Sequence, residues 1–194
     1  MRLVVATKNE GKLREFRAIF EGTQWEIVGM GELGINADVV EDADTFEGNA
    51  IKKAEQIMHL CGETTVADDS GICVEALGGA PGVYSARYSG EDATDEKNNI
   101  KLLKAMEGEK NRAAKFVCAI AIAFPNGGTQ VVKGEFHGQI GYEMKGSGGF
   151  GYDVLFYLPQ YDKTSAEISA EDKNKISHRG KALAALKSYL VKRA

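Results

Sequence analysis

Two adjacent aspartates, Asp68 and Asp69, are the residues of this 194-residue sequence that most clearly suggest chemistry. They follow a β-branched stretch at 64–66 and precede Gly71, a pattern that predicts a strand ending in a turn at the edge of a sheet. Neighbouring side chains of a strand point to opposite faces, so the turn would have to re-aim one acid if both serve one site. Paired carboxylates suit Mg²⁺, which prefers oxygen ligands. A solvated Asp-Asp turn is the alternative interpretation.

A polar segment near the N-terminus, residues 7–12 with the sequence TKNEGK, is a candidate phosphate-binding turn. It connects an apolar run at 3–6, which predicts a buried strand, to apolar residues at helical spacing over 13–20. Backbone N–H groups at a helix start attract anions, and Lys8 and Lys12 add positive charge. The segment lacks the pattern of a P-loop, and an ordinary polar connection is an equally good explanation.

An acidic cluster at 41–44, with the sequence EDAD, precedes an apolar stripe that predicts a helix over 46–61. We expect the two aspartates of the cluster in the first turn of that helix, where acids favour the helix dipole. Asn49 and Lys53 are four residues apart and share one helix face. A lysine there is usually only solvated, but beside an acidic metal site it could bind a phosphate oxygen.

Further helices are predicted from caps and apolar spacing. Thr94 or Asp92 would cap a helix whose apolar face carries Ile100, Leu103 and Met106. The last helix opens at the sequence SHRG and has a leucine stripe, and a capping box precedes it. In order, these signals lie at 164–167 for the box, at 177–180 for the opening, and at Leu183, Leu186 and Leu190 for the stripe.

The later strands include a hairpin. Residues 114–124 and 129–136 flank Asn126-Gly127-Gly128, a strong hairpin signal, and this antiparallel pair suggests a second lobe. The glycine-dense segment 146–153 would let backbone amides approach a ligand, and its aromatic side chains could stack on a base. A flexible connection before a strand at 154–158 is the alternative.

Composition narrows the class of protein. The net charge of −4 argues against a broad nucleic-acid footprint, so an anionic ligand would need local positive charge. Three cysteines without CxxC spacing suggest neither a disulfide framework nor a zinc site. The apolar start is too short for a signal peptide, and no apolar run reaches membrane-spanning length, so we expect a cytoplasmic protein that binds no membrane.

Taken together, seven segments resemble the inosine/xanthosine triphosphate pyrophosphatase family, which hydrolyses non-standard purine nucleoside triphosphates. They occur in the family's order over almost the whole chain, and together they are far more specific than any one alone. The segments are 6–12 (ATKNEGK), 46–50 with Lys53 (FEGNA and K), 67–71 (ADDSG), 78–82 (GGAPG), 85–88 (SARY), 148–153 (GGFGYD) and 177–180 (SHRG).

The resemblance implies a role for each matching residue. Asp69 would be the base for the attacking water, Lys53 would assist near the phosphates, and Mg²⁺ would be held by Glu41, Asp68 and Asp69. The triphosphate loop would comprise Thr7, Lys8, Asn9, Glu10, Gly11 and Lys12, with Lys8 at a variable position that receives no separate role. Substrate and nucleoside recognition would fall to Ser70, Phe150, Gly151, Tyr152, Asp153, Lys173, His178 and Arg179.

The resemblance also implies a fold and an assembly. We expect one α/β domain over 1–194, with two lobes on a long, mixed, twisted central sheet flanked by helices and a cleft between the lobes. A homodimer is expected as well. Two alternatives remain open: a Maf-like pyrophosphatase of modified nucleotides, which the SHRG element opposes, and a catalytically silent nucleotide sensor, which the intact acid pair opposes.

Overall fold

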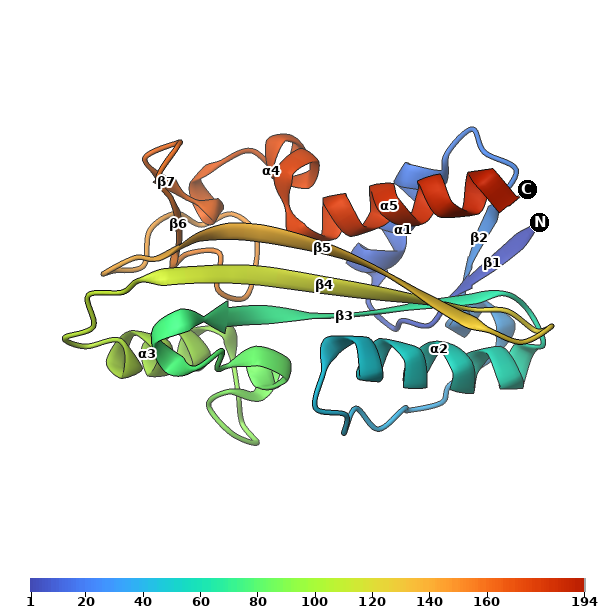
Figure 1. The fold of residues 1–194 in the computed structure, drawn as a ribbon, viewed down its shortest axis with the longest axis horizontal. Coiled ribbons are helices and arrows are strands. Elements are labelled where there is room, and N and C mark those ends of the chain that lie inside the picture. The colour runs from blue at the N-terminus through green and yellow to red at the C-terminus, as the bar shows by residue number, and fades with distance from the viewer. Residues whose placement is uncertain (194) are drawn as a thin grey trace. The chain divides into compact units, whose positions relative to one another are not determined.

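The computed structural model describes residues 1–193, which form an α/β fold (Figure 1). Seven strands make one mixed sheet in the order β2-β1-β3-β4-β5-β6-β7. In chain order the elements are β1 Arg2–Val5, α1 Glu10–Phe20, β2 Glu26–Gly29, α2 Phe46–Cys61, β3 Thr65–Val74, α3 Asp95–Ala105, β4 Ala113–Ala123, β5 Thr129–Ile140, β6 Phe156–Leu158, β7 Lys163–Thr164, α4 Ala170–Ile176 and α5 His178–Arg193. The pairings of β1 with β2 and β3 are parallel, whereas β6 pairs antiparallel with β5 and β7. The predicted mixed sheet is confirmed.

The chain forms two compact units. The first comprises Met1–Asp69, Cys118–Gly134 and the described residues from Ala182 onward, and the second comprises Ser70–Val117 and Glu135–Lys181. The expected single domain and the cleft between lobes stay predictions.

In the first unit, helices cover both faces of the strands: α2 lies on one face, and α1 and the unit's part of α5 lie on the other (Figure 1). The face under α1 and α5 carries alternate residues of β1 and β3, as expected for a strand with a period of two. The buried side chains that pack there include Leu3, Val5, Val66, Leu13, Phe16, Leu183, Leu186 and Leu190. The predicted leucine stripe of the last helix is confirmed.

In the second unit, α3 packs its C-terminal half against the sheet through Leu102 and Met106. The predicted apolar face of this helix was partly wrong, because Ile100 is exposed while Asn98 and Asn99 are buried. The amide of Asn98 accepts from Ser89 N at 2.8 Å and donates to Ala86 O at 3.2 Å, so tertiary hydrogen bonds replace apolar contacts on this face.

Strand β3 does not end after the aspartates, so the predicted turn at Gly71 was wrong. The strand continues to Val74 because the two-residue period continues through buried Ile72 and Val74. Ile72 N donates to Ser85 Oγ at 2.9 Å, which secures this half of the strand within the second unit.

The acidic cluster at 41–44 lies before α2 and not in its first turn, so that expectation was also wrong. Thr45 is the N-cap, and its hydroxyl accepts from Gly48 N at 3.0 Å. This cap fixes the helix start at Phe46 and makes Glu47 the acid of the first turn.

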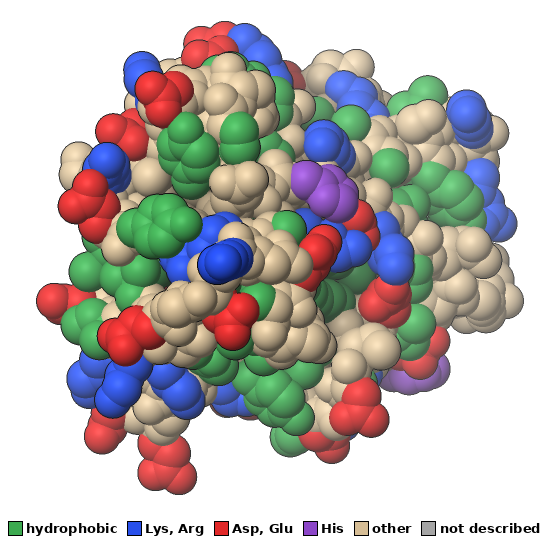
Figure 2. Space-filling view, turned by 60° about the vertical axis from the view of Figure 1, so that its left-hand side comes forward, with side chains coloured by type: hydrophobic (Ala, Val, Ile, Leu, Met, Phe, Trp, Pro, Cys, Tyr) green, Lys and Arg blue, Asp and Glu red, His purple; other side chains and the backbone are tan. Residues whose placement is uncertain are grey.

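Other local predictions are confirmed. Thr94 caps α3, and the hairpin closes through a hydrogen bond of 3.2 Å from Phe124 N to Gly128 O. The Thr164–Glu167 capping box is present, although it opens a short 3₁₀ helix. No described helix has both the length and the apolar character needed to cross a bilayer. Basic and acidic side chains are interspersed over the face shown in Figure 2, in keeping with the small net charge.

The junction of α4 and α5 generates a stability prediction. A methyl group at Gly180 would overlap the backbone carbonyl of Asn174, whereas Gly31 has open space around it and no left-handed backbone. We expect Gly180→Ala to lower the free energy of unfolding by about 1–3 kcal/mol, as overpacking does. In urea titrations Gly31→Ala should unfold close to the parent, and equal midpoints for both variants would contradict the prediction.

Candidate active site

The two aspartates lie on opposite faces of β3. Asp68 follows Val66 on the face under α1, and its carboxylate is only 2% exposed. Lys12 of α1 meets it with Nζ at 3.0 Å from Oδ1 and 2.8 Å from Oδ2. A buried carboxylate is costly without such a partner, so Lys12 stabilises the ionised acid.

Asp69 faces α2 on the other side of the strand. The side-chain amide of Asn49 donates to Asp69 Oδ2 at 2.9 Å, and its oxygen accepts from Ala43 N at 2.9 Å. Asn49 is 1% exposed, and one side chain therefore ties the acidic cluster to the second aspartate. The sequence singled out Asn49 only for its place on the helix face and gave it no role.

Lys53, one turn after Asn49 on α2, pairs with Glu41 of the acidic cluster. A hydrogen bond between the two side chains places Lys53 beside the acidic segment, and its expected position near the phosphates stays a prediction. In the same unit, Lys8 pairs with Asp38 at 2.6 Å.

The 7–12 segment turns into α1 as predicted. Asn9 caps the helix by accepting from Lys12 N at 3.0 Å, and Asn9 N donates to Thr7 Oγ1 at 3.1 Å. A cavity of about 310 Å³ opens beside this turn. It is lined by Ala6, Thr7, Lys8, Asn9, Lys12, Met30, Ala37, Asp38, Val39, Glu41, Lys53 and Ile57. Three lysines thus border one hollow of the first unit, an arrangement that can attract an anion.

The predicted metal ligands are of the right chemical type. Glu41, Asp68 and Asp69 offer only carboxylate oxygens, which Mg²⁺ prefers, and all three belong to the first unit. Within residues 1–193 no three or more acids, histidines and cysteines are clustered as a metal site. Mg²⁺ commonly uses one or two carboxylates together with waters and substrate phosphates, so a cluster of three acids is not required.

The second unit contains a separate cavity of about 150 Å³ built from the predicted nucleoside set. Its lining residues are Ser70, Gly71, Ser85, Ala86, Asp95, Asn98, Phe116, Phe150, Gly151, Tyr152, Asp153, Lys173, His178 and Arg179. All eight residues assigned to substrate and nucleoside recognition line this one cavity. Ser85, Asp95, Asn98 and Phe116 also line it, and the sequence gave no role to these four.

The 150–153 loop is held by its own side chains. Asp153 Oδ2 accepts from Phe150 N at 2.9 Å and pairs with Lys173. Tyr152 is buried and donates its hydroxyl to Ser85 O at 2.7 Å. Burial raises the pKa of the Tyr152 phenol, so this donor stays protonated well above neutral pH.

Cations and aromatic rings surround the entrance of this cavity. Phe150 is 61% exposed, with Lys173 Nζ 5.1 Å and Arg179 Cζ 5.6 Å from its ring centre. His178 stacks on Phe116 with ring centres 4.8 Å apart, and Arg179 Nη2 lies 3.4 Å from Ser70 Oγ. An exposed aromatic face beside hydrogen-bond donors suits a purine with carbonyl groups.

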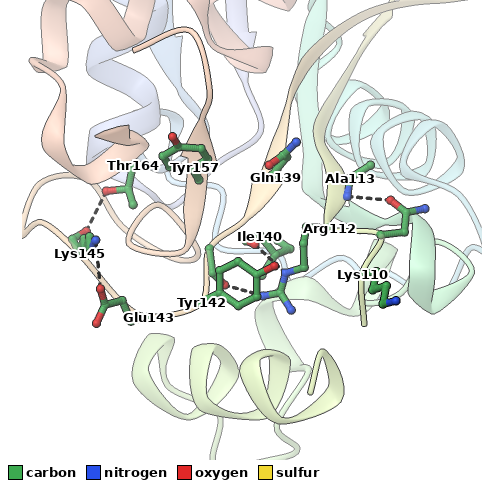
Figure 3. Close-up of a pocket in the computed structure, with 12 residues that line it drawn as sticks. Lys110, Arg112, Ala113, Gln139, Ile140, Tyr142, Glu143, Lys145, Tyr157 and Thr164 are labelled. Carbon is green, nitrogen blue, oxygen red and sulfur yellow. Dashed lines mark hydrogen bonds and ion pairs between the residues drawn. The ribbon is translucent and has the colours of Figure 1, made fainter. Parts of the chain in front are cut away.

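A third cavity, of about 550 Å³, lies in the second unit and shares no lining residue with the previous one (Figure 3). Arg112 forms one wall and donates to Met106 O, Ile140 O and Gly141 O at 2.8, 2.9 and 2.5 Å. The ring of Tyr142 lies 4.5 Å from its guanidinium carbon. These contacts join the C-terminal end of α3 to the chain after β5.

Comparison with known proteins shows the relationship. Residues 3–189 match the Ham1 family. The chain belongs to the Ham1 family. A dITP/XTP pyrophosphatase of Desulforamulus reducens is 51% identical over 94% of this chain and 92% of its own length. One of Geobacter sulfurreducens is 49% identical over 97% of this chain and 96% of its own. These relatives confirm the predicted family resemblance.

Solved structures of Ham1 proteins confirm the fold. The Staphylococcus aureus Ham1 protein superposes with a TM-score of 0.94 at 43% identity, covering 100% of both chains. A nucleoside-triphosphatase / dITP/XTP pyrophosphatase of Mycobacterium abscessus gives a TM-score of 0.83 at 39% identity, covering 96% of this chain and 98% of its own.

Asn49 provides a test of how this Ham1-family site is held together. Asn49→Ala removes a donor to Asp69 and an acceptor for Ala43 N, and we expect a loss of about 1–3 kcal/mol in the free energy of unfolding. The matched control is Asn36→Ala, at an exposed position, which should change stability by less than about 0.5 kcal/mol. Chemical denaturation of both variants measures the difference, and similar values would show that the bridge is dispensable for stability.

Proposed function

We propose that this chain hydrolyses non-standard purine nucleoside triphosphates (ITP, dITP and XTP) to the monophosphate and pyrophosphate, with Mg²⁺ as cofactor. The observation that carries the proposal is the match to dITP/XTP pyrophosphatases of about half-identical sequence over nearly the full chain. The side chains around the cavity of each unit suggest which unit would bind the triphosphate and which would bind the base. Hydrolysis of an acid anhydride is the class of reaction that the names of these relatives imply.

The first unit would hold the triphosphate. Lys12 and Lys53 supply fixed positive charge, and the capped turn at 7–12 supplies backbone amides for phosphate oxygens. Glu41 and Asp69, which both contact side chains of α2, are the residues that would hold Mg²⁺, whereas Asp68 faces the other side of β3 and pairs with Lys12. When bound, Mg²⁺ would lower the pKa of water and screen phosphate charge.

Asp69 is our proposed general base. Its carboxylate is held in place by Asn49 Nδ2, and a proton from the attacking water would go to this carboxylate. The water oxygen forms a bond to the α-phosphorus while the bond from that phosphorus to the bridging oxygen breaks. Pyrophosphate leaves and the nucleoside monophosphate remains.

The second unit would read the base. Inosine and xanthosine carry a 6-oxo acceptor, whereas adenosine carries an amino donor at that position. His178, Arg179 and amides of the 150–153 loop border the cavity and offer donors. An adenine would set donor against donor, which leaves buried polar groups unpaired at roughly 1–3 kcal/mol each.

A nucleotide panel tests the proposal as a whole. We expect pyrophosphate release with kcat/KM for ITP and XTP about 10²–10⁴-fold above that for ATP, and loss of turnover in EDTA that added Mg²⁺ restores. Tight ITP binding without turnover would instead indicate a nucleotide sensor. Preference for modified pyrimidine triphosphates would indicate a Maf-like enzyme. Release of inorganic phosphate alone would contradict the site of attack.

Asp69→Asn tests the base. The variant keeps the shape of the side chain but cannot accept the proton, so kcat for ITP should fall by about 10²–10⁴-fold with an unchanged circular dichroism spectrum. Asp92→Asn, an exposed acid outside both cavities, is the control for charge removal. Turnover near the parent value in Asp69→Asn would move the base to Asp68.

Arg179→Ala tests the reading of the base. We expect kcat/KM for ITP and XTP to fall much more than the residual ATP activity, by roughly tenfold or more for one lost charged hydrogen bond. Lys192→Ala removes a positive charge from the last turn of the same helix and should leave the ITP/ATP ratio unchanged. An equal fall for ITP and ATP would assign Arg179 to phosphate neutralisation.

A homodimer and a cytoplasmic location complete the proposal, since both were expected from the sequence. Sedimentation of the purified chain would check the first, and fractionation of cells would check the second.

A further inference from the structure

We call residues 150–153 the base loop, after the function proposed for them. One of these residues, Gly151, is held by α3 through both of its backbone polar groups. Gly151 N donates to Asp95 Oδ2 at 2.7 Å, and Gly151 O accepts from Asn99 Nδ2 at 2.8 Å. All three residues belong to the second unit. Asp95 and Asn99 lie one turn apart on the helix, so the two contacts come from a single helix face.

Asn99 is suited to a rigid connection. Its side chain is 2% exposed, and its amide nitrogen donates both to Gly151 O and to Asp95 O, the latter at 2.7 Å. Both amide protons are therefore used, and rotation of the side chain would break two hydrogen bonds. The Asn99 nitrogen is therefore held by two carbonyls, whereas its buried Oδ1 has no hydrogen-bond partner among the described residues.

The held residue lies between the two aromatic side chains of the loop. Gly151 has a positive φ of 61°, so the chain reverses between Phe150 and Tyr152. Tyr152 is anchored on Ser85 O, whereas Phe150 is 61% exposed and is flanked by Lys173 and Arg179. Fixing Gly151 therefore restrains the backbone from which the Phe150 side chain projects.

We propose that Asp95 and Asn99 are positioning residues for nucleobase recognition, acting through the Gly151 backbone to orient Phe150 and the loop amides. This inference rests on the proposed function of the 150–153 loop in reading the base. Misplacement of binding groups by about 1 Å can cost up to 10²-fold in rate, so loosening the loop should weaken base-dependent steps.

The test compares three variants at the start of α3. Asp95→Ala removes the acceptor for Gly151 N, and Asp95→Asn removes the charge but keeps an acceptor oxygen. Glu96→Ala removes a neighbouring acid from the same first turn without a contact to the loop, which controls for the helix dipole. Asp95 is exposed, so its variants should fold, as melting curves will verify.

Four readouts separate positioning from general damage. We expect KM for ITP to rise about 10-fold or more in Asp95→Ala, and the ITP/ATP ratio of kcat/KM to fall. The Ki of tripolyphosphate, which has no base, should stay at the parent value. Hydrogen exchange at the Gly151 amide should accelerate. Asp95→Asn should recover most of each effect, and Glu96→Ala should match the parent.

The outcomes distinguish this inference from the proposed function. A parent protein that prefers no oxo-purine would overturn the proposed function, and the hydrogen-exchange result would still report on the contact itself. Faster exchange with unchanged KM and an unchanged ITP/ATP ratio in an oxo-purine-selective parent would overturn the positioning role. An equal rise in KM and in the tripolyphosphate Ki would show general damage and overturn it as well.

Discussion

The alternation of side chains along β3 is the constraint on which the first unit's site depends. The strand runs from Thr65 to Val74 without a turn, so Asp68 and Asp69 must face opposite sides of the sheet. Each side is covered by a different helix, and each helix supplies one polar partner: Lys12 from α1 and Asn49 from α2. A pair of neighbouring acids that would repel each other on one face is thereby divided into two separately compensated carboxylates.

Two lysines that border the cavity beside the 7–12 turn also neutralise neighbouring carboxylates. Lys12 neutralises a carboxylate that is 2% exposed, and Lys53 does the same for Glu41, while both border the cavity beside the 7–12 turn. Removing one partner of a buried ion pair leaves an uncompensated charge, which can cost about 3–5 kcal/mol. A loss of activity in a Lys12 variant would therefore include the effect of a disturbed Asp68, and triphosphate affinity has to be measured directly to test the proposed phosphate contact.

Local sequence signals predicted those parts of the fold that local physics decides. The stripe over 46–61 and the leucines of α5 gave correct helices, because apolar periodicity reflects which face is buried. The prediction of a turn at Gly71 was wrong because a glycine permits a turn without requiring one. Buried Ile72 and Val74 continue the strand. The prediction of the buried face of α3 was partly wrong. Asn98 and Asn99 are buried there through hydrogen bonds to distant backbone groups, which apolar periodicity does not reveal. The sequence motifs identified the residues of the base loop, but they did not identify Asp95 and Asn99 of α3, which hold that loop.

The α3 helix of the second unit shows why residues outside the motifs matter. Its N-terminal half holds Gly151 through Asp95 and Asn99. Just past its C-terminal end, the carbonyl of Met106 accepts a hydrogen bond from Arg112. Arg112 also donates to the carbonyls of Ile140 and Gly141. The segment from β5 to the base loop is thus tied at both ends to one helix. Because α3 is anchored on the sheet by Leu102 and Met106, a shift of the helix would move both ties together. The position of the base loop is therefore set by the packing of α3 as well as by the loop's own glycines.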